Sequence, residues 1–239
     1  MLIQKVKEFK KVLGINEEII GISFVKRPPS DTRQCRDTAC TALARALLKG
    51  ERVVFGSQLF PQLCSGANYF LRLADVSDKE ARDVYIKDEH VFANSQSCDS
   101  FLRSLPKFPK NLINRFIIIK PLTGEGSVDI VIMLLNPAQG GRVLGLLNHR
   151  HYQPVVILPN QPSCLAIFAP LTTGQPHCNF IDYYDRYYQG TVKRQKIWPE
   201  DKMLISLTTK DFQEALKNLE KSPHGSFRPK LKPQKVDPI

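Results

Sequence analysis

The feature that most constrains the fold is an unbroken run of apolar residues at 130–135, Ile-Val-Ile-Met-Leu-Leu. A strand that packs on only one face alternates apolar with polar residues, so this run indicates a strand buried on both faces. A helix is expected to follow it at 137–148. The chain is therefore expected to cover a sheet with helices.

Strands and helices are expected to alternate along the rest of the chain. Apolar runs predict strands at 19–25, 52–55, 115–119, 155–158 and 203–207. Helical periodicity and capping residues predict helices at 3–13, 37–49, 64–73, 163–171 and 209–221, with two shorter ones starting near 77 and 97. This order predicts an α/β (or α+β) protein with a mixed sheet flanked by helices in a single compact domain.

Part of the formal net charge of +11 is concentrated at the C-terminus. Residues 222–239 are rich in proline and contain four basic residues against the single acidic Asp237. We expect a domain over 1–221, followed by a Pro/Lys-rich tail at 222–239 that is disordered or loosely attached. The remaining positive charge fits either solvated surface lysines or an anionic ligand.

The N-terminal segment is amphipathic and studded with lysine, and it lacks the apolar stretch and cleavage site of a signal peptide. No apolar run approaches the roughly 20 residues of a membrane-spanning helix. We therefore expect a soluble, cytoplasmic protein with no membrane span. In that reducing compartment, the six cysteines are expected to serve metal binding, redox chemistry or simple burial rather than disulfides.

Several cysteines are predicted to lie at or near helix starts: Cys40, Cys64, Cys98 and Cys164. Asp37 is the expected N-cap before Cys40, which becomes the third residue of its helix, and Ser97 and Ser163 are expected caps further along. The partial positive charge of a helix start lowers the pKa of a thiol. It therefore favours the thiolate, which is the form that binds metals.

Certain sequence phrases, taken in order, resemble a known family. They are CTALARALLKG at 40–50, CSGA at 64–67, KPL at 120–122, VIMLLNPAQ at 131–139 and MLISL at 203–207. Over residues 19–219 the chain resembles the prokaryotic family known as domain of unknown function 169, found in archaea and anaerobic bacteria. The resemblance implies a habitat and a fold but no established reaction. Cys40 and Cys64 fall on the family's two most recognisable cysteine positions.

One departure from the family pattern lies near the C-terminus. The family often has a short glycine-containing segment ending in arginine, whereas residues 180–186 read FIDYYDR. Arg186 matches the family's arginine, but its neighbours are bulkier. This departure puts in doubt any ligand that the loop would carry.

Our leading hypothesis is a cofactor-binding protein of anaerobic metabolism that holds an iron–sulfur cluster on cysteine ligands. It would transfer electrons or present a redox site to a partner protein, with backbone N–H groups at converging helix starts cradling the cluster. The expected ligands are Cys40, Cys64, Cys98 and Cys35, ahead of Cys164 and Cys178. Two alternatives stay open for these cysteines: burial as small apolar side chains, and a redox-active thiol.

A second candidate site follows the apolar run at 130–135. Residues 136–141 resemble a strand-to-helix turn on which a phosphate or carboxylate could rest, although the chain has no GxGxxG or P-loop phrase. The candidate residues are Asn136, Gly140, Gly141 and Arg186. The alternative function is therefore a metal-free binding module for a small anionic ligand.

Two other segments allow further interpretations. Tyrosines at 183–188 precede cations at 193–196, a pattern typical both of nucleic-acid binding and of an ordinary hairpin. A basic protein or nucleic-acid interaction module is the third alternative. His149 and His151 could ligate a metal or a haem, or simply suit the end of a helix. The oligomeric state stays open.

Overall fold

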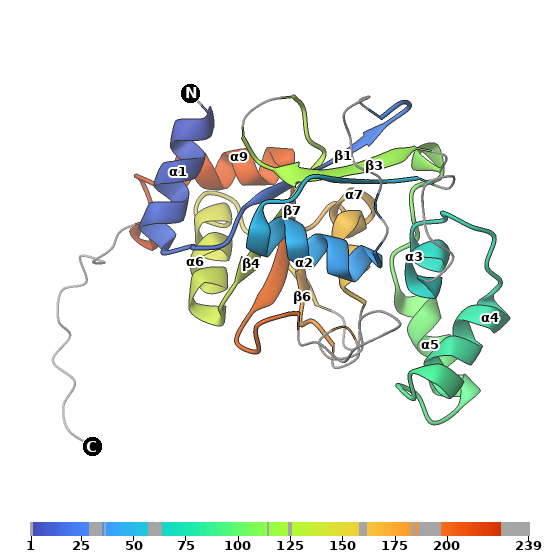
Figure 1. The fold of residues 1–239 in the computed structure, drawn as a ribbon. Helices are drawn as coiled ribbons and strands as arrows, with labels where there is room; N and C mark the ends of the chain where they lie inside the picture. The colour runs from blue at the N-terminus through green and yellow to red at the C-terminus, as the bar shows by residue number, and fades with distance from the viewer. Residues whose placement is uncertain are drawn as a thin grey trace, which may run out of the picture.

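A seven-stranded sheet forms the centre of the protein (Figure 1), in the order β2-β3-β1-β4-β7-β6-β5. The computed structural model describes residues 2–28, 35, 37–56, 64–113, 115–123, 126–157, 162–182, 185 and 197–225. The strands are β1 (Ile20–Val25), β2 (Val53–Phe55), β3 (Phe116–Pro121), β4 (Ile130–Leu135), β5 (Val156–Ile157), β6 (His177–Asn179) and β7 (Met203–Thr208). The expected α/β architecture with a mixed sheet in one compact domain is confirmed.

The sheet is antiparallel except at one edge. Strand β4 pairs antiparallel with both β1 and β7, and only β5 and β6 pair parallel. Ligand sites at the carboxyl ends of strands are a property of open parallel sheets. The end of β4 therefore lacks the topological reason that would make it a ligand site.

Strand β4 is buried along its whole length, as its sequence predicts. Ile130, Ile132 and Leu134 belong to one hydrophobic core, whereas Val131, Met133 and Leu135 belong to a second core on the opposite face. Successive side chains of a strand point to opposite faces, so one strand supplies both cores.

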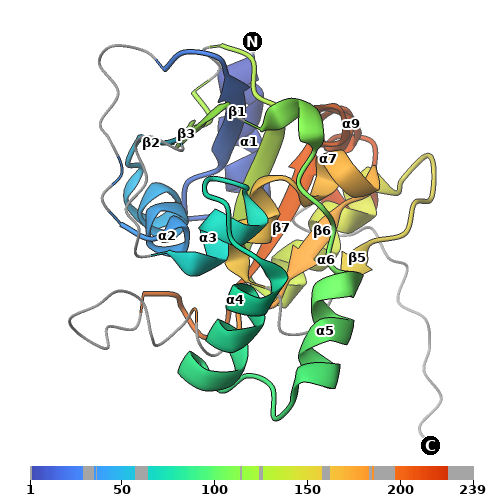
Figure 2. The same cartoon turned by 90° about the vertical axis from the view of Figure 1, so that its right-hand side faces the viewer.

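The helices are divided between these two cores (Figures 1 and 2). One face is covered by α1 (Leu2–Leu13), α6 (Pro137–Leu147) and α9 (Thr209–Asn218). The other is covered by α2 (Ala39–Lys49), α3 (Ser65–Phe70) and the 3-10 helix η3 (Ser163–Ile167), which leads into α7 (Ala169–Thr173). This second core also takes in α4 (Asp78–Asp83), the π-helical turn η1 (Val84–Asp88) and α5 (Ser95–Ser104). A short 3-10 turn, η2 (Lys110–Leu112), precedes β3.

Some elements differ from the sequence-based expectations. The helix expected at 163–171 is divided into η3 and α7, and the helix expected at 209–221 ends at Asn218. Strand β6 was not predicted, because three residues are too few to show an alternating pattern.

The ordered chain also continues past the expected boundary at 221. A 3-10 turn, η4 (Pro223–Gly225), packs near α6, and the Nε of Arg142 donates a hydrogen bond of 2.8 Å to the carbonyl of His224. The start of the expected tail therefore belongs to the fold, whereas residues 226–239 lie outside the described part of the chain.

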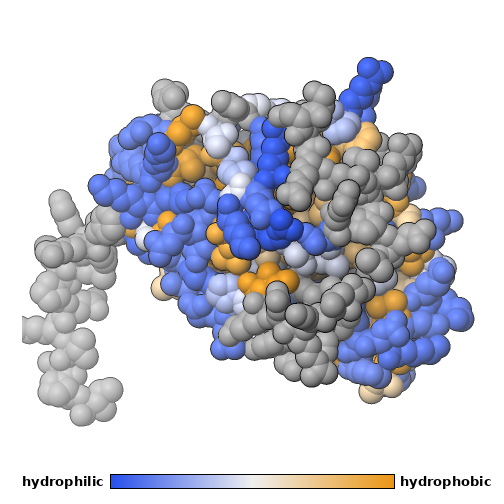
Figure 3. Space-filling model, in the orientation of Figure 1, coloured by the Kyte–Doolittle hydropathy of each residue, from blue (hydrophilic) through white to orange (hydrophobic). Residues whose placement is uncertain are grey.

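The surface is largely hydrophilic where α1 and α2 lie, with apolar residues in small separate patches (Figure 3). Exposed lysines on α1, such as Lys5 and Lys7, contribute to this surface. Within the residues described above, no helix is long and apolar enough to cross a membrane.

Candidate functional site

The first turn of α2 positions Cys40. The N-cap is Thr38 rather than the expected Asp37, because the Thr38 side chain accepts a hydrogen bond from the backbone N–H of Thr41. Cys40 is therefore the second helical residue and not the third, but it remains at the helix start. Its side chain is buried.

Cys64 lies where two helix starts meet. It occupies the N-cap position of α3 and is buried. Backbone hydrogen bonding by Ala39, the first residue of α2, and by Ala67 of α3 lowers the pKa of its thiol, although burial raises that pKa more strongly. Backbone groups from the starts of α2 and α3 therefore both act on Cys64.

A buried carboxylate links α2 to η3. The thiol of Cys40 donates to Oδ1 of Asp185 at 3.1 Å, and the backbone N–H of Ser163 donates to Oδ2 at 2.6 Å. Ser163 is thus the first residue of η3 rather than its N-cap, a position taken by Pro162. Next to it is Cys164, 1% exposed. We call Cys40, Cys64, Cys164 and Asp185 the cysteine site.

The ionisable groups of the cysteine site are all acidic: three thiols and one carboxyl group. Burial is the main cause that raises the pKa of each of its three thiols. Asp185 raises all three further, and the thiols raise one another, with Cys64 acting on both Cys40 and Cys164. The charged groups named here as acting on these thiols are acidic and favour the neutral thiol, whereas a bound cation would favour the thiolate.

Two side chains from η1 and its end lie near the same site. Burial raises the pKa of Glu89 to about 8, and Asp185 raises it as well. The buried hydroxyl of Tyr85 has its pKa raised by burial first and then by nearby acidic groups, among them Cys164 and Asp185. The acidic character of the cysteine site therefore extends to this turn.

Cys35 lies beside the cysteine site. It is 3% exposed, and its thiol donates to the backbone carbonyl of Asp37 at 3.4 Å. Burial raises the pKa of this thiol to about 11, and Cys64 is among the groups that act on it. The structure therefore places three of the four expected ligands, Cys35, Cys40 and Cys64, in one region.

Cys98 is placed elsewhere. Asn94, and not Ser97, caps α5, which makes Cys98 the fourth residue of that helix. After burial, the groups that act on its pKa are Asp99 and Arg82 rather than the other cysteines. Cys178 faces the opposite core, with α6 and α9.

Two members of the cysteine site were not among the expected ligands. On sequence grounds Cys164 is one of the two less favoured ligands. Like Cys40 and Cys64, however, it lies at the start of a helical segment. Asp185 is one of two aspartates in an aromatic stretch, and it is 145 residues from its hydrogen-bond partner Cys40. No local pattern in the sequence could have joined them.

The second candidate site, at the start of α6, is closed by its own side chains. Asn136 accepts from the N–H of Gln139 at 2.8 Å, and the side chain of Gln139 accepts from the N–H of Asn136 at 2.9 Å, a complete capping box. Gly140 packs against Met203 and Ile205 of β7, whereas Gly141 faces open space. The fourth candidate, Arg186, lies outside the described residues, as do the tyrosines at 183–184 and 187–188.

The histidines are also separated. His149 and His151 are exposed in the turn after α6. His177 of β6 is fully buried instead, and neither of its ring nitrogens has a hydrogen-bond partner among the described residues. Burial lowers its pKa to about 4.

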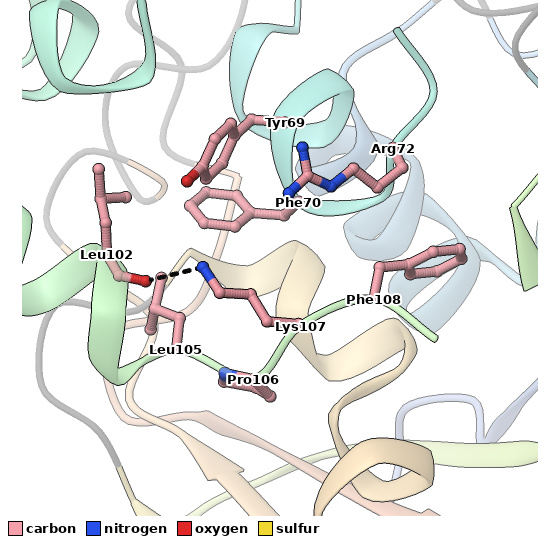
Figure 4. A pocket seen from close by; sticks show the side chains of 8 residues that line it. All are labelled: Tyr69, Phe70, Arg72, Leu102, Leu105, Pro106, Lys107 and Phe108. Carbon is pink, nitrogen blue, oxygen red and sulfur yellow. Dashed lines mark hydrogen bonds between the residues drawn. The ribbon is translucent and has the colours of Figure 1, made fainter. Parts of the chain in front are cut away.

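A small surface hollow lies between α3 and the end of α5 (Figure 4). Its two cations are engaged: Nζ of Lys107 donates to the carbonyl of Leu102 at 3.3 Å, and the guanidinium of Arg72 lies 5.3 Å from the centre of the Tyr69 ring. Aromatic and aliphatic side chains form the rest of its wall. The hollow is separate from the cysteine site and contains none of its residues.

Among the described residues, no group of three or more His, Cys, Asp or Glu side chains is gathered tightly enough to hold a single metal ion. The thiols of the cysteine site come from three different elements and influence one another electrostatically without meeting at one point. The arrangement is a loose, buried set of sulfur and oxygen donors.

The fold and site define a mixed α/β protein with a buried thiol–carboxylate cluster. The chain belongs to the family described as uncharacterised ArCR, domain of unknown function 169, whose model matches residues 8–218. The resemblance found in the sequence is thereby confirmed. No curated protein and no solved structure matches the chain.

Proposed function

We propose that this protein binds an iron–sulfur cluster at the cysteine site and uses it for electron transfer or redox work with a partner protein in anaerobic metabolism. Cys40, Cys64 and Cys164 are the proposed thiolate ligands, and Cys35 is the fourth thiol donor. Cys98 leaves the set because its neighbours are Asp99 and Arg82. The free thiols favour the cytoplasm as the location.

The observation that carries the proposal is that three buried thiols lie near enough to one another and to acidic groups to feel their charges. Deprotonating several thiols in such surroundings is unfavourable unless positive charge enters with them. Iron in a cluster supplies that charge, and the cluster supplies one-electron redox chemistry when bound.

The spacing of the donors favours a cluster over a single metal ion. A single ion requires its ligand atoms around one point, and the described residues offer no such group. A cluster distributes its thiolate ligands over several iron atoms, so donors on α2, α3 and η3 can each reach a different iron. Backbone N–H groups of Ala39 and Ala67 already act on Cys64 and would stabilise its thiolate.

The alternative of a metal-free module for a small anionic ligand has less support. Asn136 and Gln139 satisfy each other at the start of α6, and the side chain of Gln139 also donates to the carbonyl of Gly14 at 2.6 Å. A ligand there would have to replace these bonds. The basic-interaction alternative depends on segments outside the described residues.

The test is anaerobic purification of the full chain, followed by iron and sulfide analysis and a visible absorption spectrum. Cys40→Ser, Cys64→Ser and Cys164→Ser should each lose most of the iron. Cys98→Ser and Cys178→Ser are matched controls, because these thiols are also buried yet lie outside the site, and both should keep it. A wild-type chain that stays colourless and iron-free after reconstitution with iron and sulfide would disprove the proposal.

A further inference from the structure

Two backbone anchors determine where Cys35 lies. Its N–H donates to the carbonyl of Val54 in β2 at 3.1 Å, and its thiol donates to the carbonyl of Asp37 at 3.4 Å. One anchor is thus an edge strand, and the other is the residue that precedes the N-cap of α2. These two bonds, together with burial in the core, hold Cys35 beside the cysteine site.

A single arginine holds the segments of both anchors. The guanidinium of Arg45, on α2, pairs through Nη1 with the carboxylate of Asp37 and through Nη2 with that of Glu51. Glu51 lies two residues before β2 begins. Helical side chains point back toward the helix N-terminus, so Arg45 reaches the start of its own helix. A planar guanidinium can bind two carboxylates at once.

We infer that Arg45 is a positioning residue that fixes Cys35 as the fourth thiol of the cysteine site. The inference rests on the proposed function, because it assigns a ligand to that cluster. Burial is the main cause that raises the pKa of the Cys35 thiol; the charge of Asp37 raises it further, and its partner Arg45 lowers it. Cys64 acts on the same thiol. We call Asp37, Arg45 and Glu51 the clamp. Cys35 thus lies between the clamp and the cysteine site.

An ordinary surface salt bridge is the competing explanation for Arg45. The three side chains of the clamp are 31–39% exposed, and ion pairs at that exposure contribute little to stability. The molecule offers a matched pair for comparison: Nη1 of Arg82 lies 3.2 Å from Asp99, at 28% and 33% exposure, beside Cys98. A purely structural role would let Arg45→Gln and Arg82→Gln change local stability while leaving the cluster spectrum of each variant unchanged.

The first experiment measures how fast N-ethylmaleimide alkylates Cys35 in the full chain purified without added metal, followed by mass spectrometry. Arg45→Gln should raise the rate at Cys35 by roughly tenfold, because loss of the clamp lets the segment open locally. Arg82→Gln should leave it unchanged. Arg45→Lys should rescue it in part, since one ammonium cannot bridge both carboxylates as the guanidinium does. An unchanged rate in Arg45→Gln would overturn the positioning role.

The second experiment compares the spectra of anaerobically reconstituted variants. Cys35→Ser and Arg45→Gln should show the same altered cluster spectrum, distinct from that of wild type and of Arg82→Gln. If Cys35→Ser keeps the wild-type spectrum while Cys40→Ser loses its iron, the inference fails and the proposed function stands. If wild type itself binds no iron, the proposed function fails, and the ligand role of Cys35 fails with it.

Discussion

The starts of α2 and α6 are both candidate sites in the sequence, and they differ in the structure. At α6 the capping box satisfies Asn136 and Gln139, and Nζ of Lys202 lies 3.4 Å from the Gln139 side-chain oxygen. At α2 the cap leaves Cys40 to donate to a buried carboxylate among other thiols. A helix start becomes a candidate site when tertiary contacts bring unbalanced groups to it, and not because of its dipole alone.

The largest expected effect concerns His177, on the face of the sheet that carries the cysteine site. Burial lowers the pKa of this histidine from 6.5 to about 4, so the unfolded chain binds more protons between these values. The free energy of unfolding should therefore keep its full value above about pH 6.5. It should fall by about 3 kcal/mol as the pH drops from 6.5 through 4. Urea unfolding across this range should show a shallower slope for His177→Leu.

The exposed His149 is the control for that measurement. His149→Gln should keep the wild-type slope. Equal slopes for wild type and His177→Leu would contradict a neutral, buried His177.

The next effect tests whether the start of α6 is structural. A side chain at Gly140 would meet the end of Met203 at 2.8 Å and that of Ile205 at 3.2 Å. Gly140→Val should lower the free energy of unfolding by about 1–3 kcal/mol through overpacking. Iron content per folded chain should not change. A variant that folds normally but loses iron would indicate that the start of α6 belongs to the iron-binding site.

A smaller effect concerns Glu89, at the edge of the cysteine site. Its folded pKa of about 8 lies above the ordinary 4.5, so the folded chain holds the extra proton between these values. The stability of the metal-free protein should therefore decrease as the pH rises from 4.5 to 8. After allowance for partial exposure, the loss should be about 1–2 kcal/mol.

Glu89→Gln should remove this dependence in urea titrations, and Glu220→Gln, at an exposed position, should not. Asp185→Asn should bring the Glu89 pKa closer to its ordinary value, which NMR titration of the carboxyl carbon measures. If the Glu89 pKa does not change in Asp185→Asn, Glu89 is not under the electrostatic influence of the cysteine site.

The smallest effect is expected at Gly141, where an added Cβ would meet nothing within 4 Å. Gly141→Ala should raise the free energy of unfolding by about 0.5–1 kcal/mol, because alanine favours the helix more than glycine does. Thermal unfolding measures this gain. A loss of stability instead would mean that something contacts Gly141.

Local patterns account for most of the fold. The apolar run of β4, the capping phrase at Ser77 and the closing Gly50, with its φ of 69°, are each readable over a few residues. Cys40 and Cys64 were also expected, since helix starts have local patterns and the family resemblance highlights the same two positions. The predicted N-cap of α5, Ser97, is wrong by three residues, because Asn94 and Ser97 are both favourable N-cap residues and Asn94 is the one used.

The two-faced burial of β4, the order of elements and the helix-start position of Cys40 can all be predicted from local sequence. These depend on periodicity and capping, which act between residues close in the chain. The grouping of Cys164 and Asp185 with Cys40, and the separate place of Cys98, follow from tertiary packing. Contacts across more than a hundred residues depend on how the sheet and helices pack, and no local pattern encodes that packing.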